Sequence, residues 1–433
     1  MHAPAAPGKK LFSKVIIAGA GPSGLLLSLF LAEHGIKSLI LEAFPYLDTR
    51  LRASQYGIPA SRVFRKAGLI DDIRKEAIDS FPQITWRRVA DGAVIGGIDM
   101  SIVKDHEDRM VVLPLGTMIQ IMYRHCLERG ENGELIDIRF EHKVLDAGQD
   151  ADKAWVDVGI GSNGLDEETF KSKKRFEADY VIGCDGSKSQ VRKSLFGREW
   201  RGETFDSQLV VTNLYYDGFD KYGWNGGNYM VDNESWGLIA NRGKRGLWRV
   251  TLGDQAGLTE EEYLKRREYH FKRMLPGHPD PSQYELGQVN MYKTYNRCVT
   301  KMRVGRILLA ADAAHVCNPW GGYGCMTACI DVDGLADCLI GYYEGRANED
   351  ILDVWSEVRM EKFRKYVDTR SRKNMDRVSK TDPWTVAETD PFLKLLKELS
   401  LDDERRKAFI LKLTSIEYDF TQHFHTKTHS ESV

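Results

Sequence analysis

The sequence has no apolar run approaching the roughly 20 residues that a membrane-spanning helix needs, so we expect no membrane span. Its 61 basic and 63 acidic residues nearly cancel, which leaves no overall charge to attract nucleic acid or an anionic membrane. The first ten residues lack the apolar core of a signal peptide. The seven cysteines are scattered, without a C-x-x-C pair, which favours reduced thiols and a cytoplasmic location.

What the chain does contain is an ordinary globular composition, 42% apolar and 29% charged, in a length that suits about two or three domains. Near its start, the short apolar run Val15-Ile16-Ile17-Ala18 predicts a buried parallel strand. A helical pattern over residues 22–34 and a second strand over 38–42 follow it. Such a strand–helix–strand unit opens a doubly wound sheet, so we predict a mixed α/β fold with a Rossmann-like domain.

The rest of the sequence alternates between segments of that domain and segments of a β-rich one. Residues 208–252 are rich in Val, Tyr and Trp and carry glycine turns, which predicts a β-meander. Helices and buried strands are predicted elsewhere from hydrophobic periodicity. The helices are expected over 61–77, 116–129 and 327–343, and the strands over 179–184 and 306–310.

These segments predict a discontinuous Rossmann-like domain interleaved with a β-sheet domain and followed by C-terminal helices. The expected ranges are 11–80, 105–200 and 300–345 for the first domain, 81–104 and 201–299 for the β-rich domain, and 346–433 for the helical part. The first domain would then be assembled from segments that lie far apart in the sequence.

A glycine-rich loop, Gly19-Ala20-Gly21-Pro22-Ser23-Gly24, stands between the first strand and the first helix, where a dinucleotide-binding loop must lie. Gly19 permits the tight turn, Gly21 lets a pyrophosphate approach the backbone, and Gly24 lets helix and strand pack closely. Glu42 ends the second strand, where its carboxylate can accept both hydroxyls of an adenosine ribose. The candidate cofactor-binding residues here are Gly19, Ala20, Gly21, Ser23, Gly24, Glu42 and Ala43.

A second motif runs from Arg306 to His315 and carries an acid at the end of a buried strand. Asp312 can bind a ribityl hydroxyl, and the small residues after it would let the next helix approach the cofactor. The loop over 318–324 is rich in glycine and can lie flat against an isoalloxazine ring without a side-chain clash. The candidate residues of this loop, with the cysteine after it, are Pro319, Gly321, Gly322, Gly324 and Cys325.

A third motif, Asp185-Gly186, follows the strand over 179–184, at the edge where ligands bind in such sheets. In this order the three motifs resemble the family of single-component flavin monooxygenases of the aromatic hydroxylase type, the 4-hydroxybenzoate and salicylate hydroxylase group. The resemblance covers nearly the whole chain to about Tyr343. It implies non-covalently bound FAD, with Asp185 near the cofactor and Arg52 reaching the FAD phosphate and ribityl chain.

The sequence departs from the family pattern at three positions. Ala311 replaces the glycine that usually precedes the ribityl acid, and Met326 stands where the flavin loop usually ends with asparagine. Leu115 stands where a basic or amide residue usually touches the cofactor. These changes leave FAD expected and indicate a diverged branch, such as a fungal enzyme of secondary metabolism.

The resemblance also implies a reaction. NADPH or NADH would reduce the flavin, and O₂ would then form a flavin C4a-hydroperoxide that hydroxylates, or oxidatively decarboxylates, a phenolic ring. The candidate catalytic residues are Arg249, Tyr229 and Tyr323, since a base or a cation that favours the phenolate makes the ring a better nucleophile. Trp248 and Arg249 alternate on one predicted strand, so only one of them can face the pocket. Arg249 there would favour a carboxylate or phenolate substrate.

The sequence also leaves alternatives. A flavin-dependent oxidase, dehydrogenase or reductase could use the same scaffold, and a non-enzymatic Rossmann-like carrier is a further possibility that Asp312 disfavours. Cys317, Cys325 and Cys329 lack a matching ligand set, so no metal site is expected, and His315 is interpreted as a packing residue. Monomer and homodimer both remain open.

Overall fold

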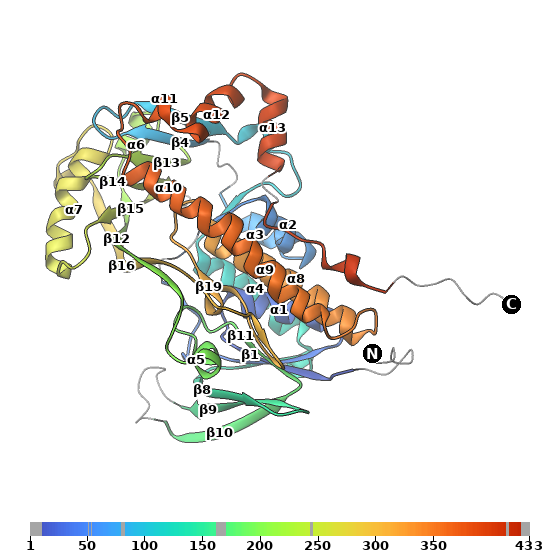
Figure 1. Cartoon of the computed structure of the whole chain (residues 1–433). Coiled ribbons are helices and arrows are strands. Elements are labelled where there is room, and N and C mark those ends of the chain that lie inside the picture. Colours follow the sequence, from blue (N-terminus) through green and yellow to red (C-terminus); the bar gives the residue numbers. More distant parts are fainter. Residues whose placement is uncertain are drawn as a thin grey trace.

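The computed structural model describes residues 11–50, 52, 54–78, 83–161, 170–242, 246–412 and 415–425. The molecule is elongated and is built on two main sheets, a six-stranded one toward one end and an eight-stranded one toward the other (Figure 1). The fold is mixed α/β, as predicted. No helix in the described part of the chain is long and apolar enough to cross a membrane.

The six-stranded sheet has the order β17-β18-β11-β1-β2-β7, with neighbouring strands parallel except for β17. Its strands come from four separate parts of the sequence, as expected for a doubly wound sheet. They are β1 (Lys14–Ala18), β2 (Lys37–Leu41), β7 (Ile136–Arg139), β11 (Tyr180–Gly183), β17 (Arg303–Val304) and β18 (Ile307–Leu309).

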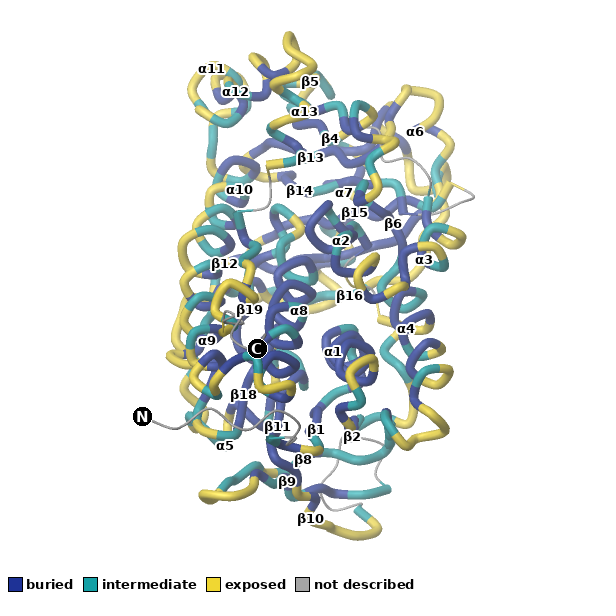
Figure 2. Tube along the Cα trace, turned by 90° about the vertical axis from the view of Figure 1, so that its right-hand side faces the viewer, coloured by how far each residue is buried: buried dark blue, intermediate teal, exposed yellow. Residues whose placement is uncertain are grey.

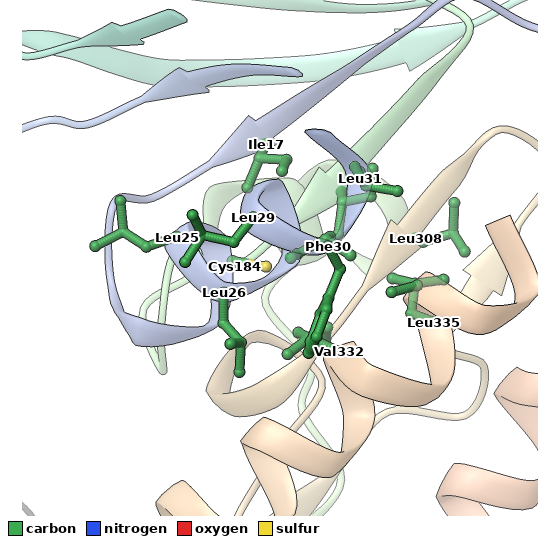
Figure 3. Close-up of a cluster of buried hydrophobic side chains, with 14 of the residues drawn as sticks. Ile17, Leu25, Leu26, Leu29, Phe30, Leu31, Cys184, Leu308, Val332 and Leu335 are labelled. Atoms are coloured by element: carbon green, nitrogen blue, oxygen red, sulfur yellow. The ribbon is translucent and has the colours of Figure 1, made fainter. Parts of the chain in front are cut away.

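Helix α1 (Pro22–Glu33) connects β1 to β2 and is apolar on all sides, which requires that it be enclosed. It packs against α4 (Leu115–Arg129) and α8 (Tyr323–Tyr343), and Figure 2 shows it as a buried rod. In Figure 3 Phe30 of α1 points toward Val332 of α8, and the leucines of α1 belong to the same buried cluster as Leu308 of β18. This core anchors the loop that begins α1.

The eight-stranded sheet has the order β19-β16-β12-β15-β14-β13-β4-β5 and is antiparallel except where β13 pairs with β4. Its long strands form the predicted β-meander and its extension. The strands are β4 (Gln83–Arg88), β5 (Val94–Asp99), β12 (Gly202–Tyr215), β13 (Gly227–Val231), β14 (Trp236–Asn241), β15 (Leu247–Asp254), β16 (Glu285–Cys298) and β19 (His315–Val316).

The two faces of this sheet pack against different parts of the molecule. One face, with Trp248 and Val250, is covered by α7 (Glu260–Met274). The other face, with Leu209 and Trp236, meets Trp320 and the C-terminal helices. Side chains alternate between the two faces along each strand. Because Trp320 belongs to the glycine-rich loop over 318–324, the second face is the one that lies toward the cofactor motifs.

Smaller elements complete the fold. Strands β8 (His142–Gln149), β9 (Ala154–Ile160) and β10 (Ser172–Ala178) form a three-stranded sheet, and β3 (Gln55–Tyr56) pairs with β6 (Val111–Val112). Helix α9 (Ile351–Lys362), a π-helical turn (Phe363–Asp368) and α10 (Thr369–Ser379) run consecutively between the two sheets (Figure 1). The other helices are α5 (Gln190–Phe196), α6 (Gly218–Lys221), α11 (Val386–Thr389), α12 (Pro391–Leu399) and α13 (Asp403–Leu411).

Two predicted helices differ in the structure. The helix expected over 61–77 is broken into α2 (Ile58–Lys66) and α3 (Ile70–Glu76), because Gly68 adopts φ +66° and ends the first of them. The helix expected from residue 327 begins at Tyr323. The first turn of α8 therefore contains residues that the sequence had placed in a loop.

Candidate functional site

The glycine loop between β1 and α1 leaves no space for a side chain at two of its glycines and leaves free space at a third. A Cβ atom on Gly24 would lie 2.1 Å from the carbonyl oxygen of Gly19, and one on Gly19, at φ +103°, would lie 2.5 Å from that of Cys184. A Cβ on Gly21 would meet nothing within 4 Å. The loop thus packs tightly on the sheet while its backbone at Gly21 faces free space, which suits a pyrophosphate at a helix N-terminus.

Glu42 stands directly after β2 and is tied to this loop. Its Oε2 accepts a hydrogen bond from the Ala20 N–H and its Oε1 one from the Phe44 N–H, both at 2.9 Å. Burial raises the pKa of the Glu42 carboxyl, and the two backbone donors oppose that rise. Ala43, next to it, is half-buried, and Ser23 is buried in α1. Each oxygen of Glu42 keeps a lone pair that a ribose hydroxyl could use.

Asp312 follows β18 and combines two properties that rarely occur together. Its side chain is accessible to solvent, yet desolvation by surrounding protein raises its pKa, while the charges of His315 and Arg52 lower it. The carboxylate therefore lies at the wall of a recess. Arg52, although distant in sequence, is close enough to Asp312 to act on its charge.

Asp185 caps the short helix α5. Its Oδ2 accepts hydrogen bonds from the N–H groups of Gln190 at 2.6 Å and Val191 at 3.2 Å. Its Oδ1 is buried without a partner in the described chain, and burial raises the pKa of the carboxyl. A Cβ on the adjacent Gly186 would meet nothing. A bound ligand could approach the open backbone at Gly186 and donate a hydrogen bond to Asp185 Oδ1.

The loop before α8 presents backbone to the same region. Gly321 and Gly322 have φ values of +116° and +68°, and a Cβ on Gly322 or Gly324 finds little or no obstruction toward solvent. Pro319 is half-buried. The loop is held from behind, since Asn374 of α10 donates to the Trp320 carbonyl at 3.3 Å. Gly324 and Cys325 belong to the first turn of α8, which corrects their expected place in the loop.

These observations agree with FAD as the occupant. The backbone is open at Gly21 and Gly322, and Asp185, whose Oδ1 has no partner among the described residues, lies beside Gly19 of the first loop. No group of His, Cys, Asp and Glu side chains in the described residues could hold a metal ion.

The eight-stranded sheet resolves which side chain of β15 faces this region. Trp248 stacks on Phe219 at 4.0 Å between ring centroids and lies on the far face. Arg249 points the other way. Its Nε donates to Asn213 Oδ1 at 3.0 Å and its Nη1 to the carbonyl oxygen of Arg52 at 2.6 Å. Arg249 is thus buried between the sheet and the cofactor motifs, with only neutral acceptors.

Arg242, at the end of β14, is buried beside Arg249. Its Nε and Nη1 have no hydrogen-bond partner among the described residues. Burial and the charge of Arg249 lower the pKa of Arg242 well below its usual value, while Tyr229, Tyr56 and Tyr292 oppose this. The neighbouring groups that act most strongly on Arg242 are Arg249 and three tyrosines, and those that act on Arg249 are Tyr292 and Tyr56; no carboxylate is among them. Two buried cations without a counter-ion are costly unless an anion binds there.

Two tyrosines complete this cluster. Tyr56 of β3 is fully buried, and its hydroxyl has no partner among the described residues. Burial raises the pKa of Tyr56 well above its usual value, so the group is a neutral donor. Burial also raises the pKa of Tyr292 on β16, against the charges of Arg249, Arg52 and Arg242. Neither tyrosine was among the predicted site residues. No local signal could have found them, because β3 and β16 lie far apart in the sequence and both tyrosines come near Arg242 and Arg249 only in the folded chain.

The other two predicted catalytic residues, Tyr229 and Tyr323, lie close to each other, and Tyr229 also lies close to Arg242. Tyr229 stacks on Trp86 at 4.9 Å, and burial raises its pKa to about 12. Burial also raises the pKa of Tyr323, which a hydrogen bond from Arg370 opposes. The structure thus brings Tyr229 and Tyr323 to the edge of the arginine cluster, where they remain protonated at neutral pH.

A serine–histidine–aspartate arrangement lies elsewhere and serves a different role. Ser235 Oγ is 2.9 Å from Nδ1 of His270, whose Nε2 is 3.5 Å from Asp254 Oδ2. All three are buried on the far face of the large sheet, so no substrate reaches them. They connect α7 to the sheet.

Comparison with known proteins agrees with this site. Residues 13–370 match the family described as FAD binding domain, and the chain belongs to that family.

Two relatives place the chain more closely. It is 32% identical to a para-nitrophenol 4-monooxygenase of Pseudomonas sp. strain WBC-3, over 93% of this chain and 95% of that protein. It is 31% identical to 6-hydroxy-3-succinoylpyridine 3-monooxygenase of Pseudomonas putida S16, over 84% and 88%. The crystal structure of the p-nitrophenol 4-monooxygenase of Pseudomonas putida DLL-E4 superposes with a TM-score of 0.83 at 29% identity, over 93% of this chain and 98% of that one.

The protein is accordingly an FAD-dependent aromatic monooxygenase. The relatives named above are bacterial, and the fungal origin suggested by the sequence remains a prediction.

Proposed function

We propose that this monooxygenase hydroxylates a phenol that binds as its anion, with NADPH or NADH as the electron donor. The observation that carries the proposal is the pair Arg242 and Arg249, which are buried together with no carboxylate partner among the described residues. The relatives act on p-nitrophenol and on a hydroxypyridine, by their names, and both are aromatic rings with an acidic hydroxyl.

The residues named as the cofactor site would hold FAD without a covalent bond. Gly19 to Gly24 would take the pyrophosphate, Glu42 the ribose, and Asp312 with Arg52 the ribityl region. Bound FAD supplies the activation of O₂ and its transfer to the ring.

The chain's own part in the reaction is to bind and orient the phenolate. A guanidinium at the phenolate oxygen lowers the pKa of the phenol and keeps the ring electron-rich where the new bond forms. Tyr56 can add a hydrogen bond, because its hydroxyl is protonated and has no partner among the described groups. Tyr229, stacked on Trp86, would line the ring's edge and exclude water.

The proposal extends to the organisation of the chain. Segments 11–80, 105–200 and 300–345 would form the FAD-binding domain, segments 81–104 and 201–299 the substrate domain, and 346–433 a helical part that braces both. The enzyme would work in the cytoplasm, as a monomer or homodimer.

The test compares 4-nitrophenol with its methyl ether, which has the same ring but cannot ionise. Dissociation constants are measured from the change in flavin absorbance. We expect 4-nitrophenol to bind at least about tenfold more tightly, which corresponds to about 1.4 kcal/mol. Equal affinity for the ether would contradict a phenolate site.

Turnover then separates a monooxygenase from an oxidase on the same scaffold. We expect NADPH or NADH oxidation that depends on the phenol, and ¹⁸O from labelled O₂ in the hydroxylated product. Substrate oxidation without label in the product would assign the enzyme to the oxidases.

A further inference from the structure

Ala311, immediately before Asp312, has an unusual backbone conformation. It is buried and has φ +57°, in the left-handed region that residues other than glycine rarely adopt. The preceding residue, Ala310, is still extended, with φ −131° and ψ 157°. The chain therefore reverses at Ala311, and this reversal determines where the Asp312 carboxylate points.

A single hydrogen bond from another element holds that reversal. The N–H of Ala311 donates to Oδ2 of Asp331 at 3.1 Å. Asp331 lies on α8 and has no exposed surface. A buried carboxylate on a neighbouring helix thus fixes the backbone at the point where the left-handed turn begins.

Asp331 is itself held in place by buried partners. Its Oδ1 accepts from Nε of Arg359 at 2.7 Å, and Arg359 has no exposed surface either. Arg359 also donates from Nη2 to Thr327 Oγ1 at 3.0 Å and from Nη1 to the Ile416 carbonyl at 2.5 Å. Three fixed acceptors leave the guanidinium a single orientation, and that orientation fixes the carboxylate.

His315 also contacts the Asp331 carboxylate. His315 Nε2 lies 2.8 Å from Asp331 Oδ2, and His315 stacks on Phe363 of the π-helical turn at 4.4 Å. Burial alone would raise the pKa of Asp331, but the charges of His315 and Arg359 outweigh it and lower the pKa. Asp331 is therefore an anion at neutral pH and a strong acceptor for the Ala311 N–H.

We propose that Asp331 is a positioning residue for FAD, which acts by holding Ala311 in the left-handed conformation that aims Asp312 at the cofactor. Arg359 orients Asp331 in this role. The inference rests on the proposed contact between Asp312 and FAD. It explains why a charged pair is buried on α8 and α9, where no ligand reaches it.

The size of the effect follows from the backbone preference. Without its acceptor, the alanine would favour right-handed or extended conformations by roughly 1–2 kcal/mol, and the carboxylate of Asp312 would turn away. FAD binding should weaken by about 5- to 30-fold, since each 1.4 kcal/mol is tenfold. Glycine at position 311 has no such preference, so it should make the hydrogen bond dispensable.

The experiment uses Asp331→Asn and Arg359→Lys, each alone and each combined with Ala311→Gly. Asparagine keeps the shape of Asp331 but cannot accept from both Arg359 and Ala311. Apoprotein is titrated with FAD, and the dissociation constant is read from flavin fluorescence, with the melting temperature measured in parallel. The matched control is Ala313→Gly, since Ala313 is also buried in the same turn but has no positive φ.

We expect both single variants to bind FAD more weakly and to melt at a lower temperature. Ala311→Gly should restore most of the FAD affinity but not the melting temperature, and Ala313→Gly should restore neither. A purely structural Asp331 would show no rescue, or equal rescue by both glycines, and either result overturns the proposal. If Asp331→Asn does not fold, the Arg359→Lys pair, which keeps both charges, decides. Failure of the unaltered apoprotein to bind FAD would instead refute the proposed cofactor site.

Discussion

The cofactor motifs and the sheet face that carries Arg242 and Arg249 are built by opposite means. The region around Gly19 to Gly24 and Gly321 to Gly324 is built from backbone, with side chains removed so that a ligand can approach. The sheet face around Arg242 and Arg249 is built from long cationic side chains that have no carboxylate partner among the described residues. The first region is preorganised by tight packing, whereas the second stores unfavourable electrostatic energy that a bound anion would relieve.

Because of this difference, we expect the two regions to respond differently to substitution. A backbone cradle fails through steric overlap, so one methyl group is enough to destroy it. A side-chain pocket fails through lost affinity, and removing one of its charges can even stabilise the fold. The following changes test that contrast, from the largest expected effect to the smallest.

Gly24→Ala should have the largest effect. Its methyl group would lie 2.1 Å from the Gly19 carbonyl oxygen, so α1 must move away from β1, at a cost of at least about 3 kcal/mol. We expect loss of bound flavin and a lower melting temperature. Gly21→Ala is the control, since a Cβ there meets nothing in the protein. It should leave apoprotein stability unchanged and weaken only FAD binding. Flavin retained by Gly24→Ala on gel filtration would contradict the steric account.

Asp312→Ala should weaken FAD binding without unfolding the protein. Losing one charge-assisted hydrogen bond costs about 1.5–3 kcal/mol, or roughly ten- to hundredfold in affinity. The carboxylate is accessible to solvent, so its removal leaves no buried cavity. FAD titration of the apoprotein measures the change, with Glu42→Ala in parallel. Unchanged affinity in either variant would remove that residue from the cofactor site.

Arg242→Met should separate stability from binding. We expect affinity for 4-nitrophenol to fall about tenfold or more, since a charged hydrogen bond is lost, while FAD remains bound. The unfolding free energy should rise by about 1–2 kcal/mol, because a buried cation without a partner is replaced by an apolar chain. Lys173→Met on the exposed strand β10 controls for the loss of a surface charge. Lower stability together with unchanged substrate affinity would show that Arg242 is structural.

Asp179 lies away from both regions, and its replacement should have the smallest effect on ligand binding. Its carboxylate accepts from Ser13 N at 2.8 Å, Lys14 N at 3.0 Å and Lys153 Nζ at 2.6 Å. Although burial raises the pKa of Asp179, these donors lower it to about 2. A depressed pKa stabilises the fold above the unfolded value, near 3.9, and this stabilisation is lost as pH falls through about 2.

In acid denaturation, Asp179→Asn should therefore be less stable than the parent by about 2 kcal/mol above pH 4, with the difference vanishing near pH 2. Binding of FAD and of phenol at neutral pH should not change. A stability difference that persists at the lowest pH would show that the donors do not act through the charge of Asp179.

The FAD-binding motifs of this protein could be predicted from the sequence. The order of Gly19 to Gly24, Glu42 and Asp312 indicates an FAD-binding fold, because each motif is local and glycine acts through its own backbone. The alternation of Trp248 and Arg249 likewise follows from strand geometry alone. The choice between their two faces does not, since it depends on which sheet face meets the cofactor motifs.

The arginine–tyrosine cluster, the break between α2 and α3 and the conformation of Ala311 could not be predicted, because each depends on how the folded chain packs. Tyr56 and Tyr292 join Arg242 and Arg249 because β3, β16 and the neighbouring strands β14 and β15 come together from distant parts of the sequence, and no local pattern encodes that meeting. The break between α2 and α3 depends on the φ of a single glycine. The strained Ala311 is tolerated because Asp331, twenty residues later, accepts its N–H from a buried helix. Local motifs specify what the backbone can do, whereas the burial of Arg242 and Arg249, on which the proposed substrate class rests, exists only after the sheets have packed.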